Sequence, residues 1–313
     1  PQAARTICRM ITAEPASTDG SADSRTSRQA DWELDFYSRP ILEADGKKRW
    51  ELLITSTPDR TGQPPFRFER RCPAGDVNST WLASALRDAL DQAREEGWLP
   101  PQRLRSWRSA MRTMVQRAGS ELGLEVRPSR RTYALIDWLV QREREVYPTE
   151  AGFMAGPLAP TPAPAAMPAI PLPEAVRGDA WSWASLPLGS LIEAQDWPLG
   201  FHDLLPIRGN LDLKHPVPGL RLFSRSRSLA LAGWLGGLEP VRLRVEGRQL
   251  VLDAGQDDAW LVTDLEPEAA DTTRHALERA RGQIDGLQFI AVQATPDTPR
   301  FEGFWMLRDQ PEP

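Results

Sequence analysis

Acidic residues spaced two apart on an expected strand are the first feature of this sequence that could do chemistry. In Trp32–Pro40, Glu33 and Asp35 fall on one face, because successive side chains of a strand point to opposite sides. Glu51, on the next expected strand, can point to the same face. Carboxylates that converge on two divalent cations form the centre of metal-dependent nucleases. Asp35 and Glu51 are therefore candidate metal ligands.

The fourth expected strand argues against that site. It reads "RLRSWR", so arginine stands where such a site needs a further carboxylate. Acidic and basic residues also alternate along the neighbouring strands, and cross-strand charge pairing accounts for this pattern without a metal. We therefore interpret the acids as structural and keep a metal-dependent ribonuclease H-like nuclease, using Asp35 and Glu51, as an alternative.

Other catalytic motifs are missing from the sequence. It contains no phosphate-binding glycine loop, no G-x-S-x-G elbow, no C-x-x-C and no H-E-x-x-H. The three histidines show no metal-ligand spacing. The prediction is a protein that is not an enzyme, with no catalytic residue, no metal and no cofactor.

Arginine is concentrated between Arg103 and Arg131, in a chain whose net charge is −5. Eight arginines lie there against two glutamates, with Trp107 among them. A smaller basic set in the second half includes Arg225 and Arg227. Guanidinium groups bind phosphates, and aromatic rings stack on unpaired bases. The pattern is typical of single-stranded nucleic-acid binding, but equally of an arginine face that is paired with acidic residues.

The 12 tryptophans are mostly expected in the core, because large aromatic rings contribute mainly through buried area. Trp305, beside Phe304 in the last expected strand, leaves two interpretations open. It completes the core of the second domain, or it offers a stacking surface.

Bulk composition indicates a soluble intracellular protein of two domains. The chain has 313 residues, of which 41% are apolar and 26% charged. Its two cysteines exclude a disulfide framework, and no apolar run reaches the roughly 20 residues of a membrane span. No membrane insertion is expected.

The expected domains follow from composition. Residues 1–30 are polar and predicted to be a disordered tail, more typical of a bacterial leader than of an acid-poor transit peptide. Residues 31–153 form an α+β domain, 154–178 a proline-rich extended linker, and 179–313 a second α+β domain.

In the first domain, apolar residues alternate with polar ones in three segments, and short connections favour an antiparallel sheet. Later segments carry apolar residues at helical spacing, the first with Asn78 as its cap. The expected strands are Trp32–Arg39, 48–55, 66–70, 103–108 and 124–129, and the expected helices 79–97, Ser109–Leu122 and Thr132–Tyr147. This order, βββαβαβα, is that of the ribonuclease H-like fold.

The second domain is predicted to have a largely antiparallel sheet. A hairpin is expected around the Glu246–Gly247 turn, and Gly236 and Gly237 are expected to end a short helix. The expected strands are 181–188, 218–224, 241–255 (the hairpin), 259–265, 286–293 and 302–309, and the expected helices are Ser228–Leu235 and Pro267–Gln283.

Five strings resemble one family. They are "WELDFYSRPILEADGKKRWELLI", "RLRSWRSAM", "PSRR", "SRSLALAGWLGGLE" and "GFWMLRD", and together they run from Trp32 to Asp309. They are similar to the Tab/Atab-type RNA-binding proteins of cyanobacteria and plastids. The family's closing motif usually reads Phe-Trp-Leu-Leu where this chain has Met306, and the family tends to have two aromatic residues at Ser106 and Trp107.

The resemblance implies non-catalytic binding of A/U-rich single-stranded mRNA leaders, which supports translation and biogenesis of photosystem subunits, chiefly of photosystem I. Further partners would be the translation machinery or photosystem assembly factors, and a protein-interaction scaffold for assembly is another alternative. The expected location is the cyanobacterial cytoplasm, with the plastid stroma as the alternative. The residues predicted to contact RNA are Arg39, Arg103, Arg105, Trp107, Arg108, Arg130, Arg131, Arg225, Arg227, Phe304 and Trp305.

Overall fold

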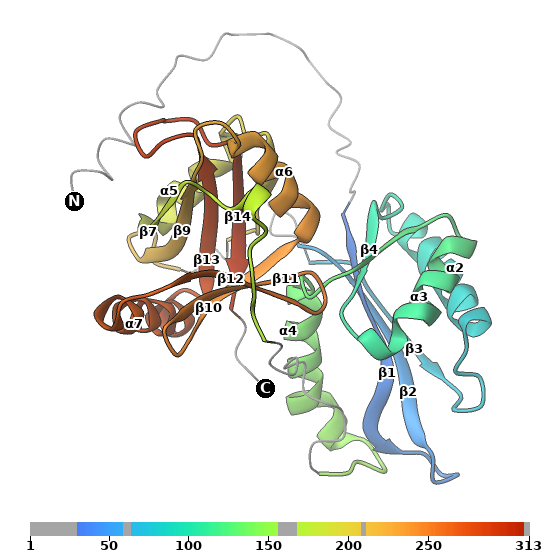
Figure 1. Cartoon of the computed structure of the whole chain (residues 1–313). Coiled ribbons are helices and arrows are strands. Elements are labelled where there is room, and N and C mark those ends of the chain that lie inside the picture. The colour runs from blue at the N-terminus through green and yellow to red at the C-terminus, as the bar shows by residue number, and fades with distance from the viewer. Residues whose placement is uncertain (1–29, 59–63, 156–167, 208–210, 310–313) are drawn as a thin grey trace. The chain divides into compact units, whose positions relative to one another are not determined.

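The computed structural model describes residues 30–58, 64–155, 168–207 and 211–309 (Figure 1). Their contacts group into two compact units, one built mainly from 30–155 and the other mainly from 168–309. Nearly all of the predicted tail and residues 156–167 of the predicted linker lie outside these ranges.

The N-terminal unit is built on a five-stranded sheet with the order β3-β2-β1-β4-β5. The first three strands pair antiparallel, as the alternation predicts, and β4 and β5 run parallel to β1. The strands are β1 (Trp32–Leu42), β2 (Lys48–Ser56), β3 (Arg67–Cys72), β4 (Arg103–Ser106) and β5 (Glu125–Pro128).

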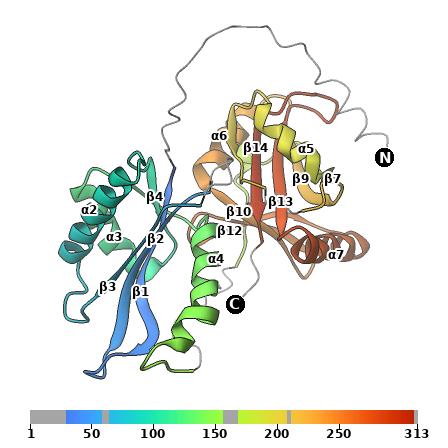
Figure 2. The same cartoon turned by 180° about the vertical axis from the view of Figure 1, so that it is seen from behind.

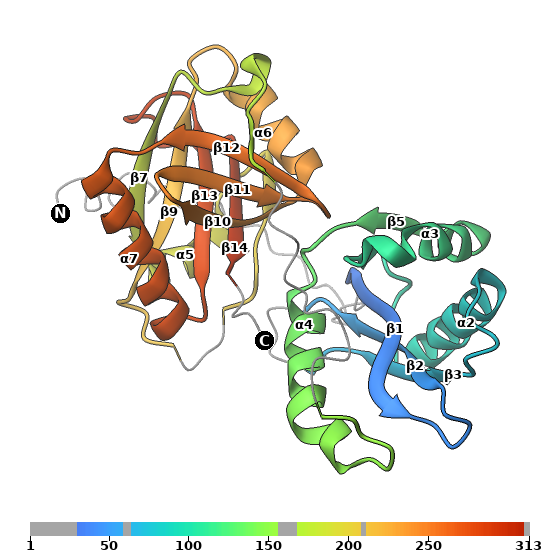
Figure 3. The ribbon, with the colours of Figure 1, turned by 60° about the horizontal axis from the view of Figure 1, so that its bottom comes forward.

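Three α-helices cover this sheet: α2 (Ser79–Glu95), α3 (Arg112–Glu121) and α4 (Tyr133–Gln141). In Figure 3, α2 and α3 lie on one face of the sheet and α4 lies on the other. The observed order of the elements is the predicted one, and the fold class is α+β. The finer assignment to a ribonuclease H-like fold stays a prediction.

The ends of these helices differ in part from the predicted ones. The side chain of Asn78 accepts a hydrogen bond from the N–H of Trp81 at 2.9 Å, so the predicted N-cap of α2 is confirmed. The predicted single helix Thr132–Tyr147 is divided into three parts. After α4, which ends at Gln141, the chain makes one π-helical turn, Arg142–Val146, and then a 3₁₀ turn, Tyr147–Thr149. The middle residue of the 3₁₀ turn is the proline that was expected to end the helix.

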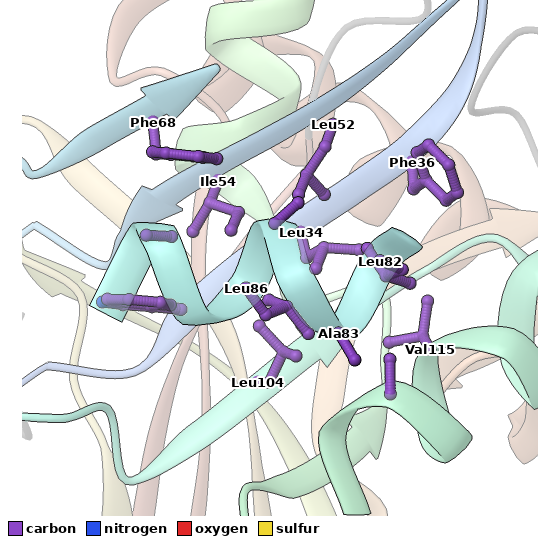
Figure 4. Close-up of a cluster of buried hydrophobic side chains, with 14 of the residues drawn as sticks. Leu34, Phe36, Leu52, Ile54, Phe68, Leu82, Ala83, Leu86, Leu104 and Val115 are labelled. Carbon is purple, nitrogen blue, oxygen red and sulfur yellow. The ribbon is translucent and has the colours of Figure 1, made fainter. Parts of the chain in front are cut away.

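The core of this unit lies between the sheet and the helices α2 and α3 (Figure 4). Leu34 and Phe36 of β1 and Leu52 and Ile54 of β2 point to this side and are at most 1% exposed. They meet the apolar stripe of α2, which includes Leu82 and Leu86, as well as Leu104 of β4 and Val115 of α3. Glu33, Asp35 and Glu51 alternate with these apolar residues along β1 and β2. Their side chains must therefore point to the opposite face of the sheet, toward α4.

The C-terminal unit contains two sheets. The five-stranded one has the order β7-β9-β13-β14-β8 and the four-stranded one β10-β11-β12-β6. The strands are β6 (Ile170–Pro171), β7 (Ala180–Pro187), β8 (Phe201–Asp203), β9 (Pro216–Phe223), β10 (Pro240–Glu246), β11 (Gln249–Ala254), β12 (Asp258–Asp264), β13 (Leu287–Gln293) and β14 (Gly303–Arg308). Antiparallel pairs predominate narrowly, since β9–β13, β14–β8 and β12–β6 are parallel.

Its helices are α5 (Leu188–Glu193), α6 (Ser228–Leu238) and α7 (Pro267–Gln283). Both faces of β13 and β14 are covered. One face packs in a cluster with α6 and strands β10 and β11, and the other packs with α5 and the C-terminal part of α7. Figure 2 shows α5 against β7 and β9, and Figure 3 shows β10, β11 and β12 crossing in front of β13 and β14.

Two predictions for this unit are wrong in detail. Helix α6 continues through Gly236 and Gly237 and ends before Glu239, which has a φ of 54°. A Cβ at 236 would lie 3.4 Å from the ring of Phe201, an ordinary van der Waals contact, so this packing does not require glycine there. Strand β6, within the predicted linker, pairs with β12 and so belongs to the second sheet.

No helix among the described residues is long and apolar enough to cross a membrane.

Candidate nucleic-acid interface

Asp35 lies at the centre of a buried ionic cluster on the α4 side of the N-terminal sheet. Its side chain is fully covered, and both carboxylate oxygens accept hydrogen bonds from arginines. Nη1 of Arg39 donates to Oδ2 at 2.8 Å, while Nε of Arg108 donates to Oδ1 at 2.5 Å and its Nη2 to Oδ2 at 3.3 Å. Arg39 and Arg108 are only 2% and 7% exposed. The two guanidinium groups therefore clamp one carboxylate.

The electrostatics of this clamp do not fit a metal ligand. Burial by itself would raise the pKa of Asp35, but the charges of Arg108 and Arg39 outweigh it and hold that pKa below its ordinary value. The carboxylate is thus charged and already neutralised. Among the described residues, no three His, Cys, Asp or Glu side chains gather as a metal ion would require. The donor set around Asp35 is that of a structural ion pair.

Glu51, the other acid considered for metal binding, is held in a second part of the same cluster. Its Oε2 accepts a hydrogen bond from Oη of Tyr147 at 2.9 Å and lies 3.4 Å from Nη2 of Arg142 and from Nε of Arg39. Burial, helped by the charge of Glu51, raises the pKa of Tyr147 to about 12 against the opposing charges of Arg39 and Arg142, so Tyr147 remains a hydrogen-bond donor at neutral pH. The π-helical turn after α4 brings Arg142 and Tyr147 over the sheet.

Arg108 is also enclosed by two aromatic rings. Its Cζ lies 4.2 Å from the ring centroid of Tyr37 and 3.9 Å from that of Trp107, distances at which a guanidinium interacts with the π-face. Trp107 is half-buried and also packs against the apolar cluster of α4. The pairing of arginine with aromatic residues in "RLRSWR", predicted as a base-stacking feature, is here an internal contact.

Glu33 is buried beside the first turn of α4. Its Oε2 accepts a hydrogen bond from the N–H of Leu135 at 2.8 Å, and Arg105 lies opposite it in the β1–β4 register. Burial raises the pKa of Glu33 to about 8, since desolvation outweighs the hydrogen bond from Leu135 and the charge of Arg105. This carboxyl group is therefore mostly protonated at neutral pH.

Replacing Glu33 by glutamine is expected to make the protein more stable at alkaline pH. Since the folded pKa is raised, the stability that Glu33 contributes is present below pH 4.5 and is lost as the pH rises toward about 8. The Glu33→Gln variant carries no charge, so its free energy of unfolding should exceed that of the wild type by up to about 5 kcal/mol at pH 9, which is what a pKa raised from 4.5 to about 8 corresponds to. Urea unfolding at pH 5, 7 and 9 measures the difference, which should shrink toward pH 5.

The control for this prediction is Glu95→Gln, which removes a carboxylate from an exposed position of α2. Because this side chain is exposed, its replacement should change the free energy of unfolding by less than about 0.5 kcal/mol at each of the three pH values. An equal pH dependence in both variants would contradict the burial of a protonated Glu33.

The remaining arginines of the segment have mixed exposure. Arg105 and Arg131 are buried at 4% and 2%, and Nη1 of Arg105 lies 2.7 Å from Asp31. The Arg103 side chain is 39% exposed and 3.8 Å from the same aspartate, and Arg130 is half-buried. Most of the arginines between Arg103 and Arg131 are therefore paired with acids or buried. This agrees with the interpretation of the segment as an arginine face that is paired with acidic residues.

In the C-terminal unit the predicted residues separate into two groups. Phe304 and Trp305 are 0% and 2% exposed and lie on opposite faces of β14, inside the two apolar clusters. Of the two interpretations, the structure favours core packing. Arg225 is exposed, and Arg227, with 41% of its side chain exposed, lies 3.5 Å from Asp179.

Arg117 is one of the accessible arginines that were not among the predicted contacts. Arg117 is exposed on α3, and no ion pair engages it within the described parts of the chain. The signal was present in the sequence, because Val115 and Ala118 on the same helix are buried, which places Arg117 on the outer side.

Comparison with known families matches both halves of the chain. Residues 31–142 match the family described as "RNA-binding protein Tab2/Atab2 N terminal", and residues 159–308 match "RNA-binding protein Tab2/Atab2, C-terminal domain". No solved structure matches.

Two plant proteins are similar over nearly the whole chain. The "Protein TAB2 homolog, chloroplastic" of Zea mays is 37% identical over 96% of this chain and 76% of its own length. The protein of the same name from Arabidopsis thaliana is 31% identical over 96% of this chain and 80% of its own length.

Proposed function

This chain belongs to the Tab2/Atab2 family of RNA-binding proteins, and from that membership we propose that it binds A/U-rich single-stranded leaders of mRNAs for photosystem subunits, chiefly of photosystem I. Binding would promote translation and assembly of these subunits without catalysis. The observation that carries the proposal is that the two family matches together span both compact units. The two relatives are named chloroplastic, which favours the plastid stroma over the cyanobacterial cytoplasm.

We restrict the proposed RNA contacts to those predicted residues whose side chains are exposed or half-buried. Arg103, Trp107 and Arg130 in the N-terminal unit and Arg225 and Arg227 in the C-terminal unit all reach the surface. Exposed arginines can bind phosphates, and a partly exposed indole can stack on an unpaired base. The buried arginines of the segment would act indirectly, by holding the strands that carry these residues.

Salt dependence distinguishes RNA binding from a role as a protein scaffold. We expect the protein to bind an A/U-rich single strand more tightly than a G/C-rich one of equal length, because a G/C-rich strand pairs with itself more stably and leaves fewer unpaired bases available. Log affinity should fall linearly with log salt, by about 0.7 for each phosphate contact. Fluorescence anisotropy at several salt concentrations measures both. A lack of binding, together with photosystem partners that co-purify after ribonuclease treatment, would favour the scaffold.

Replacing Arg225 by alanine should weaken RNA binding about 5- to 10-fold and reduce the salt slope by about 0.7. Arg225 is exposed, and no described carboxylate is hydrogen-bonded to its side chain. The matched control is Arg94→Ala, which removes an exposed arginine paired with Asp91 on α2. If both variants keep the wild-type slope, Arg225 is not a contact.

The same reagents test the nuclease alternative. RNA incubated with the protein and Mg²⁺ or Mn²⁺ should remain intact. Cleavage that disappears in an Asp35→Asn variant would instead assign the chemistry to this cluster.

A further inference from the structure

Strand β7, Ala180–Pro187, forms one edge of the five-stranded sheet and, among the described strands, pairs with β9 alone. It pairs with β9 along all eight residues, from Ala180 opposite Phe223 to Pro187 opposite Pro216, with no register shift. The outer edge of β7 therefore presents a straight row of backbone N–H and C=O groups. Such an edge is a template for another strand unless something blocks it.

The usual protections of an edge strand are charged side chains, a bulge, an interior proline or short length. β7 reads AWSWASLP, so it has no charged residue, and its one proline is the last residue. Trp181 is 38% exposed, and six further residues of the strand are exposed or half-buried without being charged.

Every other described sheet edge has one of these protections. β3 carries four charged residues in six, and β10 carries three together with a register shift. β5 has four residues, two of them charged, while β8 and β6 have only three and two residues. Among the described sheet edges, β7 alone therefore lacks these protections.

We propose that β7 is a self-association edge, at which two copies of this chain pair β7 with β7 antiparallel about a twofold axis and join their five-stranded sheets. Arg225 and Arg227 contact Asp179, the residue before β7, but none of the proposed RNA contacts lies on the strand, and the proposal does not depend on them.

Charge is the argument for a second copy as the occupant. In an isologous pair each strand meets itself, so a charged residue near its own counterpart is repelled. β7 contains no such residue in any register. With the axis at Trp183, Trp181 lies opposite Ser185 of the other copy, and the nearest flanking acid, Asp179, lies opposite Pro187 instead of its own counterpart. RNA is disfavoured here because β7 offers no cation to a phosphate.

The test is the molar mass of the full chain, measured by sedimentation equilibrium over a wide range of concentration. We expect a reversible monomer–dimer equilibrium, weak because one strand pair is a small interface. The double variant Trp181→Lys/Ser185→Lys should raise the dissociation constant at least about tenfold, since both positions are exposed and place like charges opposite each other. Trp181→Glu/Ser185→Glu should do the same.

Mixing the two double variants distinguishes charge repulsion between two β7 strands from misfolding of the variants. Lysines of one chain then face glutamates of the other, so an equimolar mixture should form heterodimers that neither variant forms alone. The control Leu229→Lys changes an exposed apolar residue of α6, 59% exposed, and should leave the equilibrium unchanged. A wild type that is monomeric throughout, a mixture that does not recombine, or equal dissociation by Leu229→Lys would each overturn the proposal.

Discussion

Replacing Asp35 by alanine is expected to lower the free energy of unfolding by about 3–5 kcal/mol, because it leaves two buried guanidinium groups without their shared carboxylate. Arg39 and Arg108 are 2% and 7% exposed, and both donate to Asp35. Neither guanidinium group can reach water unless the end of β1 or the segment after β4 moves. Urea unfolding at pH 7 measures the loss.

The matched control is an exposed ion pair of the same type. Arg70 and Asp88 are bonded on the surface, with side chains 40% and 52% exposed, so Asp88→Ala should cost less than about 1 kcal/mol. The cost of Asp35→Ala should stay constant between pH 5 and 8. The lowered pKa means that the stability from Asp35 is present above its unfolded pKa and is lost only as the pH falls through the folded value. Equal costs for the two variants would contradict the buried clamp.

Replacing Trp305 by alanine is expected to cost about 3–5 kcal/mol of unfolding free energy, the range for deleting a large aromatic side chain from a core. Trp305 is 2% exposed in the cluster that β14 shares with α6 and β10. Its ring lies directly over Gly303, where a Cβ would come within 2.3 Å of Cη2. Chemical denaturation of the full chain measures the loss.

Binding data separate this structural role of Trp305 from base stacking. Trp305→Phe retains an apolar ring and should cost clearly less than the alanine variant. RNA affinity, corrected for the folded fraction, should be unchanged in both variants. A loss of affinity in a fully folded Trp305→Phe protein would restore the stacking interpretation.

Local pattern was enough to predict most of the elements. Alternation in Trp32–Arg39 identified β1, the cap at Asn78 located the start of α2, and Pro267–Gln283 is helix α7 with the predicted ends. These features depend on neighbouring residues alone. The strings that resemble the Tab/Atab family were likewise readable without a structure, and the family matches confirm them.

Long-range contacts determined what the polar residues do. Alternation shows that Glu33 and Asp35 share a face, but not that α4 covers it or that Arg108, 73 residues away, reaches Asp35. Alternation likewise could not decide whether Trp305 lies in the core or on the surface. The second face of a strand shows the same period of two whether it is exposed to solvent or packed against another layer. Helix α6 passes through two glycines despite their low helix propensity, because its apolar residues Leu231, Ala232 and Leu235 are packed in the core.

The sequence by itself determined the element order of the N-terminal unit, the α+β class and the family. Only the tertiary structure decided that Asp35 is neutralised by arginines and that Glu33 is buried as a mostly protonated acid. It also decided that six of the predicted RNA contacts are buried: Arg39, Arg105, Arg108, Arg131, Phe304 and Trp305. The physical reason is that backbone periodicity is a local property, whereas burial and ion pairing depend on which distant segments cover a face.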